Sequence, residues 1–412
     1  MTTMQSTAVQ RGEREYSLAD AAHRALSAIS ELGFTVRLDY YGGDPTVWRC
    51  QLFDGQQPAP GGSGYGKGAV DTARVGAHYE ALEHFLTQQH RPETVQLRRC
   101  AELVESPLGT ECYAALLAMQ PDQLIACRIY HQLGGTNTLA VPLFLSNVLW
   151  ADDAAAPLRA EVGDTTDYRS LIRYSSNNGS AIGGSLAEAA VHSLNEVIER
   201  DAVSLFLAHT FLATPPARPA FLAPETLPVD LRELLEAVQQ RVSRKVWLVD
   251  ITTDLGVPAT LAYAAGLPGC SRRGYGASLS RHYSIYRALT ELLEGELTDD
   301  RAEDRRRAVD WLADYPALQA CAAFELPPPT TSSDYVPYAD TEVPPSPAQH
   351  LSCLVDKLAE RGYSVYLNEF HASANGVTTV HIHVPELERF NMIADGPSAV
   401  VPGRRALRAL QG

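Results

Sequence analysis

A stretch in the middle of the chain carries several acidic side chains and one histidine at helical spacing. Residues 185–209 read SLAEAAVHSLNEVIERDAVSLFLAH. At 100° per residue, four polar side chains fall within about 80° of one another, and the apolar side chains occupy the other face. These four are Glu188, His192, Glu196 and Glu199. The pattern also fits an ordinary solvent-exposed helix face, which is common in proteins.

Two features favour a cation-binding role for this face. It contains no lysine, and Arg200 lies only at its margin, whereas exposed faces usually pair glutamate with a base four residues later. Like charges at this spacing repel by a few tenths of a kcal/mol per pair, and a bound cation would remove that repulsion. The preceding residues 175–184 (SSNNGSAIGG) predict a glycine-containing loop, whose backbone N–H groups can meet an anion at the start of the helix.

Two further segments carry the same kinds of residue. Glu80 and Glu83 share a face of a predicted helix over residues 71–89, just after the glycine-rich GYGKG with Lys67. This is no Walker A loop, because the GxxxxGK[ST] pattern is absent, and a surface turn is the alternative. In SRHYSIYRALTELLEGE, Arg287 stands four residues before Glu291, which predicts either a weak surface ion pair or a phosphate contact. Carboxylates, a few cations and glycine-rich segments together indicate a magnesium–nucleotide site.

The elements that must position these residues predict an α+β fold. A helix over residues 17–33 has Ser17 as its N-cap, and FTVRLDYYGG and TVWRCQLFDG alternate like a hairpin joined through GGDP. We expect the glycine-rich PAPGGSGYGKG to be a loop, GYGASLS to lead into a helix, and residues 1–14 to be a frayed tail. Further expected elements are helices over 185–209, 231–243, 282–296 and 348–361, strands within KVWLVDITT, ATLAYAAGL, SVYLNEF and TTVHIHVP, and a proline-rich linker over 326–347. Mixed helices and strands of this kind predict sheets with helices packed on them.

Composition excludes several classes of protein. The 412 residues carry a net charge of −15, so nonspecific binding to nucleic acid is not expected. The N-terminus lacks the apolar region of a signal peptide, and no apolar run reaches the length of a membrane span. Seven widely spaced cysteines without a CxxC argue against a disulfide framework and a cysteine zinc site. We therefore expect a cytoplasmic protein.

Several motifs resemble those of the YcaO family, in the family's order. The run SNNGSAIGGSLAEAAVHSLNEVIERDA resembles its hallmark segment, and GKG followed by AxxxGAHYEALEHF resembles its Sx₃Ex₂E nucleotide motif. YRALTELLE is similar to RALxExxQ, and VPELERFNMIADGPSAVVPGRR is similar to the C-terminal PGLExF…PG.R stretch. The resemblance covers residues from about 60 to the end. It implies a YcaO-type fold, with mixed and antiparallel sheets and helices around a central ATP cleft.

Carried over residue by residue, the resemblance implies a binding site for ATP and Mg²⁺. The implied metal ligands are Glu80, Glu83, Glu188, Glu196 and Glu199, and the implied contacts to the nucleotide are Lys67, Arg74, Arg200, Arg287, Asn178 and His192. His192 and Arg287 are the catalytic candidates. Three positions depart from the family pattern: Gly76 replaces a serine, only Ser185 matches the Asn or Thr before the helix, and Glu294 replaces a glutamine. The C-terminus lacks the PxPxP ending of many members.

The resemblance also implies an activity and partners. The family activates backbone amides of a peptide with ATP, and we expect cyclodehydration of Cys, Ser or Thr to thiazoline or oxazoline in a ribosomally made precursor. Thioamide or macroamidine formation by the same activation is one alternative, and a non-catalytic scaffold subunit is another. Expected partners are a leader-bearing precursor peptide, a separate leader-binding protein of the ThiF-like or clasp type, a flavin dehydrogenase and a second copy of the chain. We expect residues 1–60 to form a partner-docking region and 61–412 the catalytic domain.

Overall fold

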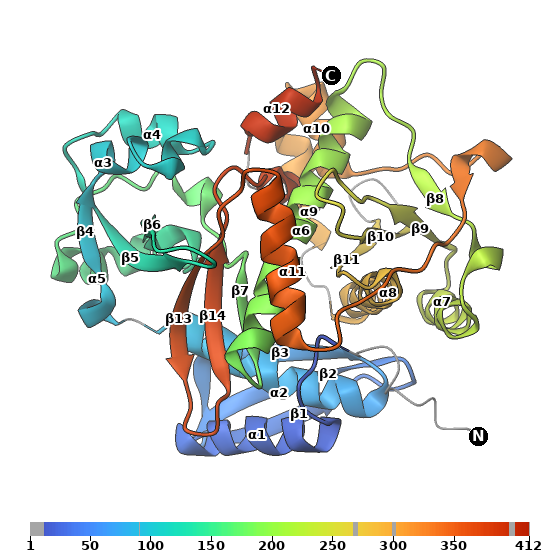
Figure 1. The fold of residues 1–412 in the computed structure, drawn as a ribbon, viewed down its shortest axis with the longest axis horizontal. Coiled ribbons are helices and arrows are strands. Elements are labelled where there is room, and N and C mark those ends of the chain that lie inside the picture. Colours follow the sequence, from blue (N-terminus) through green and yellow to red (C-terminus); the bar gives the residue numbers. More distant parts are fainter. Residues whose placement is uncertain (1–11, 90, 267–270, 299–301, 395–399, 412) are drawn as a thin grey trace.

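The computed structural model describes residues 12–89, 91–266, 271–298, 302–394 and 400–411. Within these residues the strands form three sheets of three, five and six strands, and helices pack around and between them (Figure 1). The predicted α+β class is confirmed. Among the expectations from sequence, those for residues 1–11, Cys270 and residues 395–399 lie outside the described residues.

The N-terminal sheet is antiparallel and packs on two helices. Its strands are β1 (Thr35–Tyr40), β2 (Thr46–Asp54) and β3 (Gln57–Gly68), and its helices are α1 (Leu18–Glu31) and α2 (Val70–Thr87). The Ser17 side chain caps α1 by accepting a hydrogen bond from the Asp20 N–H, as predicted. The hairpin is also confirmed. The expected boundary at residue 60 falls within β3, so this strand belongs to both predicted segments.

The loop expected at PAPGGSGYGKG is wrong, because this segment is strand β3. Its glycines are required by close packing rather than by a turn. A Cβ atom at Gly66 would stand 1.8 Å from the Ala73 carbonyl oxygen of α2. Close packing also accounts for the glycines of GYGASLS, whose first four residues lie in strand β11 (Arg272–Ala277): a Cβ at Gly274 would stand 2.2 Å from the Ala288 carbonyl oxygen of the next helix.

The other two sheets flank the centre of the molecule. The antiparallel six-stranded sheet has β4 (Gln96–Arg99), β5 (Leu124–Gln132), β13 (Tyr366–Ala372), β14 (Thr378–His383) and β7 (Ser180–Gly183) in spatial order, with β6 (Thr138–Pro142) paired to β5. The mixed sheet has the order β11, β10 (Ala259–Ala264), β9 (Val246–Asp250), β8 (Ala220–Leu222) and β12 (Tyr335–Val336), where β8 and β12 are parallel. Short helices α3 (Cys100–Val104), α4 (Ala114–Ala118) and α5 (Ala156–Val162) lie beside the first of these sheets (Figure 1).

The central element is α6 (Leu186–Leu207), which the acidic pattern predicted. Ser185 caps it by accepting a hydrogen bond from the Glu188 N–H, and a π-helical turn over Ala208–Leu212 follows it. The main core cluster joins α6 to both flanking sheets. The remaining helices are α7 (Val229–Val242) and α8 (Arg281–Thr298) on the mixed sheet, α11 (Pro347–Glu360) against α6, and α9 (Ala302–Trp311), α10 (Pro316–Ala323) and α12 (Arg404–Ala409). None of the helices in the described ranges is long and apolar enough to cross a membrane.

Candidate functional site

A cavity of about 420 Å³ lies where helices α2, α6 and α8 meet strand β3. Every residue expected at a nucleotide site lines it except Arg74 and Asn178. Those that line it are Lys67, Glu80, Glu83, Glu188, His192, Glu196, Glu199, Arg200 and Arg287. Side chains from four separate segments therefore converge on one space.

Glu199 lies at the centre of the charged groups and is 1% exposed. Its Oε1 is 3.7 Å from Arg200 Nη1, and its Oε2 is 3.9 Å from Arg287 Nη2. Arg200 also lies 4.0 Å from Glu196. At these separations the ion pairs with Glu199 are longer than hydrogen bonds, so neither arginine has to break a hydrogen bond to Glu199 to turn toward phosphate oxygens.

Lys67 reaches the cavity from β3 and meets the helix α8. Its Nζ is 2.9 Å from Glu294 and 3.7 Å from Glu291. Burial lowers the pKa of Lys67, but the neighbouring carboxylates of Glu294 and Glu291 raise it more, so the amine stays protonated. Glu294, which replaces the family's glutamine, thus gives this lysine a charged partner.

Burial and neighbouring carboxylates raise the pKa values of three glutamates in the cavity. Burial and the charge of Glu294 raise the pKa of Glu80 to about 8. Burial and the charge of Glu196 raise the pKa of Glu83 well above its usual value. Burial and the charge of Glu291 raise the pKa of Glu199 to about 7. Burial is the largest cause in each case; Lys67 partly offsets it at Glu80, and Arg200 and Arg287 partly offset it at Glu199. The cavity is short of positive charge.

Backbone groups partly offset the effect of burial on three of these carboxylates. Hydrogen bonding by the backbone of Gly179 lowers the pKa of Glu196, that of Tyr65 lowers the pKa of Glu80, and that of Ile182 lowers the pKa of Glu83. Burial and the nearby Arg287 lower the pKa of His192, so its imidazole is neutral at neutral pH. Of the predicted residues, the site therefore offers carboxylates, the arginines Arg200 and Arg287, and the neutral imidazole of His192.

These residues fit Mg²⁺ bound together with a nucleotide. The Glu199 Oε2 atom is buried and accepts no hydrogen bond within the described part of the chain, which costs free energy unless a cation or donor meets it. No three Asp, Glu, His or Cys side chains in the described ranges are arranged as a ready ligand set. Mg²⁺ is usually bound by one or two carboxylates and completed by water and substrate phosphates, which this arrangement allows.

Arg14 is a site residue that the sequence reasoning missed. Its guanidinium lines the cavity and donates to Glu188 at 2.9 Å. The neighbouring Glu13 anchors this segment, because its carboxylate accepts hydrogen bonds from Ser278 and Asn195. The segment was expected to be a frayed tail because it is polar and precedes the first helix. No sequence pattern around Glu13 and Arg14 distinguishes a segment held against the cavity from one that lies free in solvent.

Arg74 and Asn178 lie elsewhere in the structure. The Arg74 side chain is about half exposed and pairs with Asp71 at 3.3 Å on the surface of α2. Asn178 does not line the cavity, although the adjacent Asn177 does. Their predicted contacts to the nucleotide stay predictions.

Comparisons with known proteins agree with this geometry. The sequence profile of the YcaO family, described as an ATP- and Mg²⁺-binding cyclodehydratase, matches residues 65–388. An uncharacterised protein from Methanothermobacter thermautotrophicus is 30% identical over 240 residues, which are 54% of this chain and 58% of that protein.

Solved structures share the fold at low sequence identity. A heterocyclase in complex with substrate and cofactor has a TM-score of 0.64 and 19% identity, with 92% of this chain and 54% of that chain covered. YcaO from Methanopyrus kandleri, bound with AMPPCP and Mg²⁺, has a TM-score of 0.63 and 20% identity, with 93% and 94% covered. The E. coli microcin synthetase complex has a TM-score of 0.57 and 14% identity, with 85% and 88% covered. The chain spans little more than half the length of the heterocyclase and of the archaeal relative. With the family profile matched over most of its length, the chain belongs to the YcaO family, whose domain binds ATP and Mg²⁺.

Proposed function

We propose that this chain uses ATP to activate a backbone amide of a peptide, so that an adjacent Cys, Ser or Thr side chain closes a thiazoline or oxazoline ring. The observation that carries the proposal is the convergence of buried carboxylates and arginines on one cavity, with Glu199 between Arg200 and Arg287. An amide oxygen is a very poor leaving group. Bound Mg–ATP supplies the phosphoryl group with which that oxygen can leave as phosphate.

The residues of the cavity have separable roles in this proposal. The metal would be held by carboxylates among Glu80, Glu83, Glu188, Glu196 and Glu199. Arg287 and Arg200 would turn from Glu199 to the phosphate oxygens and balance charge as it develops there. The neutral His192 would accept the proton of the substrate thiol or hydroxyl as it adds to the carbonyl carbon.

The proposal includes partner proteins. A similar fold occurs in a heterocyclase solved with substrate and in the microcin synthetase complex, which supports a peptide substrate and assembly with other subunits. We therefore propose that a separate leader-binding protein presents the precursor peptide to this chain.

The test is an ADP-release assay with Mg²⁺, ATP and the precursor peptide encoded beside this gene, with the neighbouring gene products added. Peptide-stimulated ADP release and loss of one water from the peptide are expected. Exchange of oxygen for sulfur would instead indicate thioamidation. Glu199→Gln keeps the size of the side chain but removes its charge, and we expect it to lower the rate by about a hundredfold or more.

The matched control is Glu102→Gln, an exposed glutamate of α3 outside the cavity. It should leave the rate unchanged. If Glu199→Gln releases ADP at the wild-type rate, the assigned site is wrong. If the complex modifies the peptide without ATP turnover, this chain acts as a non-catalytic scaffold subunit.

A further inference from the structure

Arg128 is a buried cation on strand β5 of the six-stranded sheet. It is 5% exposed, and its side chain makes no hydrogen bond or ion pair with any described residue. The Nη1 atom in particular is buried without an acceptor. Moving a guanidinium out of water is costly unless an anion or hydrogen-bond acceptors take the place of the water. The described part of the chain supplies neither, so this cation lacks a counter-charge.

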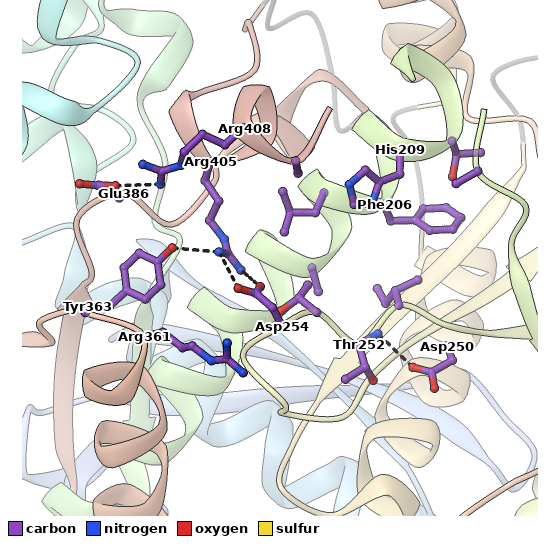
Figure 2. A pocket seen from close by; sticks show the side chains of 18 of the residues that line it. Phe206, His209, Asp250, Thr252, Asp254, Arg361, Tyr363, Glu386, Arg405 and Arg408 are labelled. Atoms are coloured by element: carbon purple, nitrogen blue, oxygen red, sulfur yellow. Dashed lines mark hydrogen bonds and ion pairs between the residues drawn. The ribbon is translucent and has the colours of Figure 1, made fainter. Parts of the chain in front are cut away.

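The other buried arginines of the described residues have such partners. Arg405 lies at a cavity of about 1000 Å³ at the carboxyl end of α6, where Figure 2 shows it paired with Asp254. It also forms an ion pair with Asp201 at 2.9 Å. Arg389 donates to His383 Nδ1 at 2.9 Å. The guanidinium on β5 therefore differs from both, although all three are similarly buried.

A β-bulge in β13 brings a second arginine to the same place. The pairing of β13 with β14 shifts register between Glu369 and His371, which leaves Phe370 as the extra residue. The Arg128 Cζ atom lies 4.3 Å from the centre of the Phe370 ring. Arg91, which follows α2, donates to the Phe370 carbonyl oxygen at 2.8 Å, and its Nη2 atom lies 3.4 Å from His371 Nδ1. Both guanidinium groups therefore contact Phe370.

The charges at this bulge are not balanced. Burial and the charge of Arg91 lower the pKa of Arg128. Tyr130 and Glu93 oppose this shift but do not cancel it. An arginine nevertheless stays protonated in a protein, so the two cations repel one another. The contact with the Phe370 ring offsets only part of this cost, because an aromatic face carries no net charge. An anion between the two guanidinium groups would offset the rest.

A second polar group at the bulge also lacks a partner. Thr379 is fully buried and pairs directly with His371 across the ladder, and its Oγ1 atom makes no hydrogen bond with any described residue. Side chains directly opposite one another in a ladder have Cβ atoms about 5 Å apart, so this hydroxyl lies beside the His371 ring. Burial and the charge of Arg91 lower the pKa of His371, so its imidazole is neutral and adds no charge. A guanidinium and a hydroxyl are donors that suit the oxygen atoms of an anion.

We propose that a small oxyanion, either phosphate or carboxylate, binds at the β13 bulge between Arg91 and Arg128. A planar guanidinium meets two oxygens of such a group with parallel hydrogen bonds, and two guanidinium groups balance its charge. Arg91 and His371 are half-buried, so the bulge reaches the molecular surface. Neither arginine lines the nucleotide cavity, so this binding is independent of the proposed reaction.

The test measures the melting temperature of the full chain in chloride buffer of constant ionic strength, with inorganic phosphate or acetate added in steps. We expect a rise with one or both anions, because a ligand bound only by the folded protein stabilises it. A rise with phosphate alone identifies a phosphate site, and a rise with acetate alone identifies a carboxylate site. In Arg128→Met we expect the rise to begin at a concentration about tenfold or more higher, because one charge-assisted contact is lost.

The same variant separates this site from the nucleotide cavity. A response through that cavity would be equal in Arg128→Met and wild type, because Arg128 does not line it. Arg99→Met is the matched control and should respond like the wild type, since Arg99 is exposed on β4 and pairs with Asp122 at the surface. In chloride alone, Arg128→Met should melt at the wild-type temperature or above it, because an apolar side chain replaces an uncompensated buried charge.

Three results would overturn the inference. The first is an equal response of wild type and Arg128→Met to both anions, which includes no response in either protein. The second is a lower melting temperature of Arg128→Met in chloride, which would show that the guanidinium is already compensated. The third comes from Arg91→Met, which tests the half-buried side of the site by the same measurement and should also need about tenfold more anion. A response of Arg91→Met equal to wild type would leave no second cation at the site.

Discussion

Glu111 is a buried carboxyl group outside the nucleotide cavity. Its Oε1 atom accepts a hydrogen bond from the Glu386 N–H at 2.9 Å and lies 3.7 Å from His383 Nε2. Burial raises the pKa of Glu111 to about 7, against the opposing charge of Arg389. The folded protein therefore holds a proton on Glu111 that the unfolded chain releases near its ordinary pKa of about 4.5. A raised acid pKa means that stability is lost as the pH rises between these two values.

We predict that Glu111→Gln removes this part of the pH dependence. Glutamine keeps an acceptor for the Glu386 N–H but cannot ionise. The free energy of unfolding of the variant, relative to wild type, should rise between pH values of about 4.5 and 7, by up to about 3 kcal/mol. Urea unfolding across this range measures it, with the exposed Glu102→Gln as the control. Parallel curves for the variant and wild type would show that Glu111 does not titrate as described.

Arg14 is the second residue whose role can be tested alone. It brings a cation from outside the three helices and donates to Glu188 in the cavity. We predict that Arg14→Ala raises the KM for ATP by about tenfold, because one charge-assisted contact is lost from a site already short of positive charge. Steady-state kinetics measure the change, and Arg37→Ala on the exposed side of β1 is the control. If the KM for ATP is unchanged, Arg14 positions Glu188 but does not contribute to ATP binding.

At the scale of elements, the site is built from two similar units. In each, a strand containing Gly-Tyr-Gly is followed by a helix that carries charged residues into the nucleotide cavity. Strand β3 precedes α2, and strand β11 precedes α8. In both strands the glycines let the helix backbone approach closely: a Cβ at Gly64 or Gly276 would come within 2.3 Å of backbone atoms of α2 or α8. Close approach is what brings Glu80 and Arg287 within reach of the same space.

We predict that Gly66→Ala destabilises the protein and weakens nucleotide binding together. The added methyl group must displace α2, and overpacking of this kind costs about 1–3 kcal/mol. Gly295→Ala in α8 is the matched control, since its nearest neighbour would be 3.9 Å away and alanine favours the helix by about 0.5–1 kcal/mol. Thermal melting with and without Mg–ATP measures both effects. A Gly66→Ala protein as stable as wild type would show that β3 and α2 pack less tightly than described.

The elements also show what the sequence could and could not predict. Helix α6 and its cap at Ser185 were predictable, because its periodicity and its capping residue agree. Strands β3 and β11 were not, since glycine is a poor strand former and reads as a loop unless the approaching helix is known. The anchored Arg14 was missed for a related reason. Its place depends on Glu13 meeting Ser278, and no local pattern encodes a contact across 265 positions.

At the scale of the whole molecule, three distant segments meet behind α6. Asp201 accepts hydrogen bonds from the Glu388 N–H at 3.0 Å and from Arg405 Nε at 2.9 Å. Glu388 in turn accepts from the N–H groups of Gly403 and Ala406 at the start of α12. Asp201 lies in the hallmark segment, and Glu388, Gly403 and Arg405 lie in the C-terminal stretch that suggested the family. The network therefore joins these two motifs in the structure.

The last prediction concerns this network. Arg405 is 7% exposed and Asp201 is fully buried, so Arg405→Met leaves an uncompensated charge in the core. Breaking such a pair from one side costs about 3–5 kcal/mol, which urea unfolding should show. Arg408→Met on the same helix is the control, because its pair with Glu386 is exposed and contributes little. The double variant Asp201→Asn with Arg405→Met removes both charges and should regain part of the loss. Asparagine keeps an acceptor for the Glu388 N–H, so a double variant no more stable than Arg405→Met alone would show that the unpaired Asp201 charge does not cause the loss.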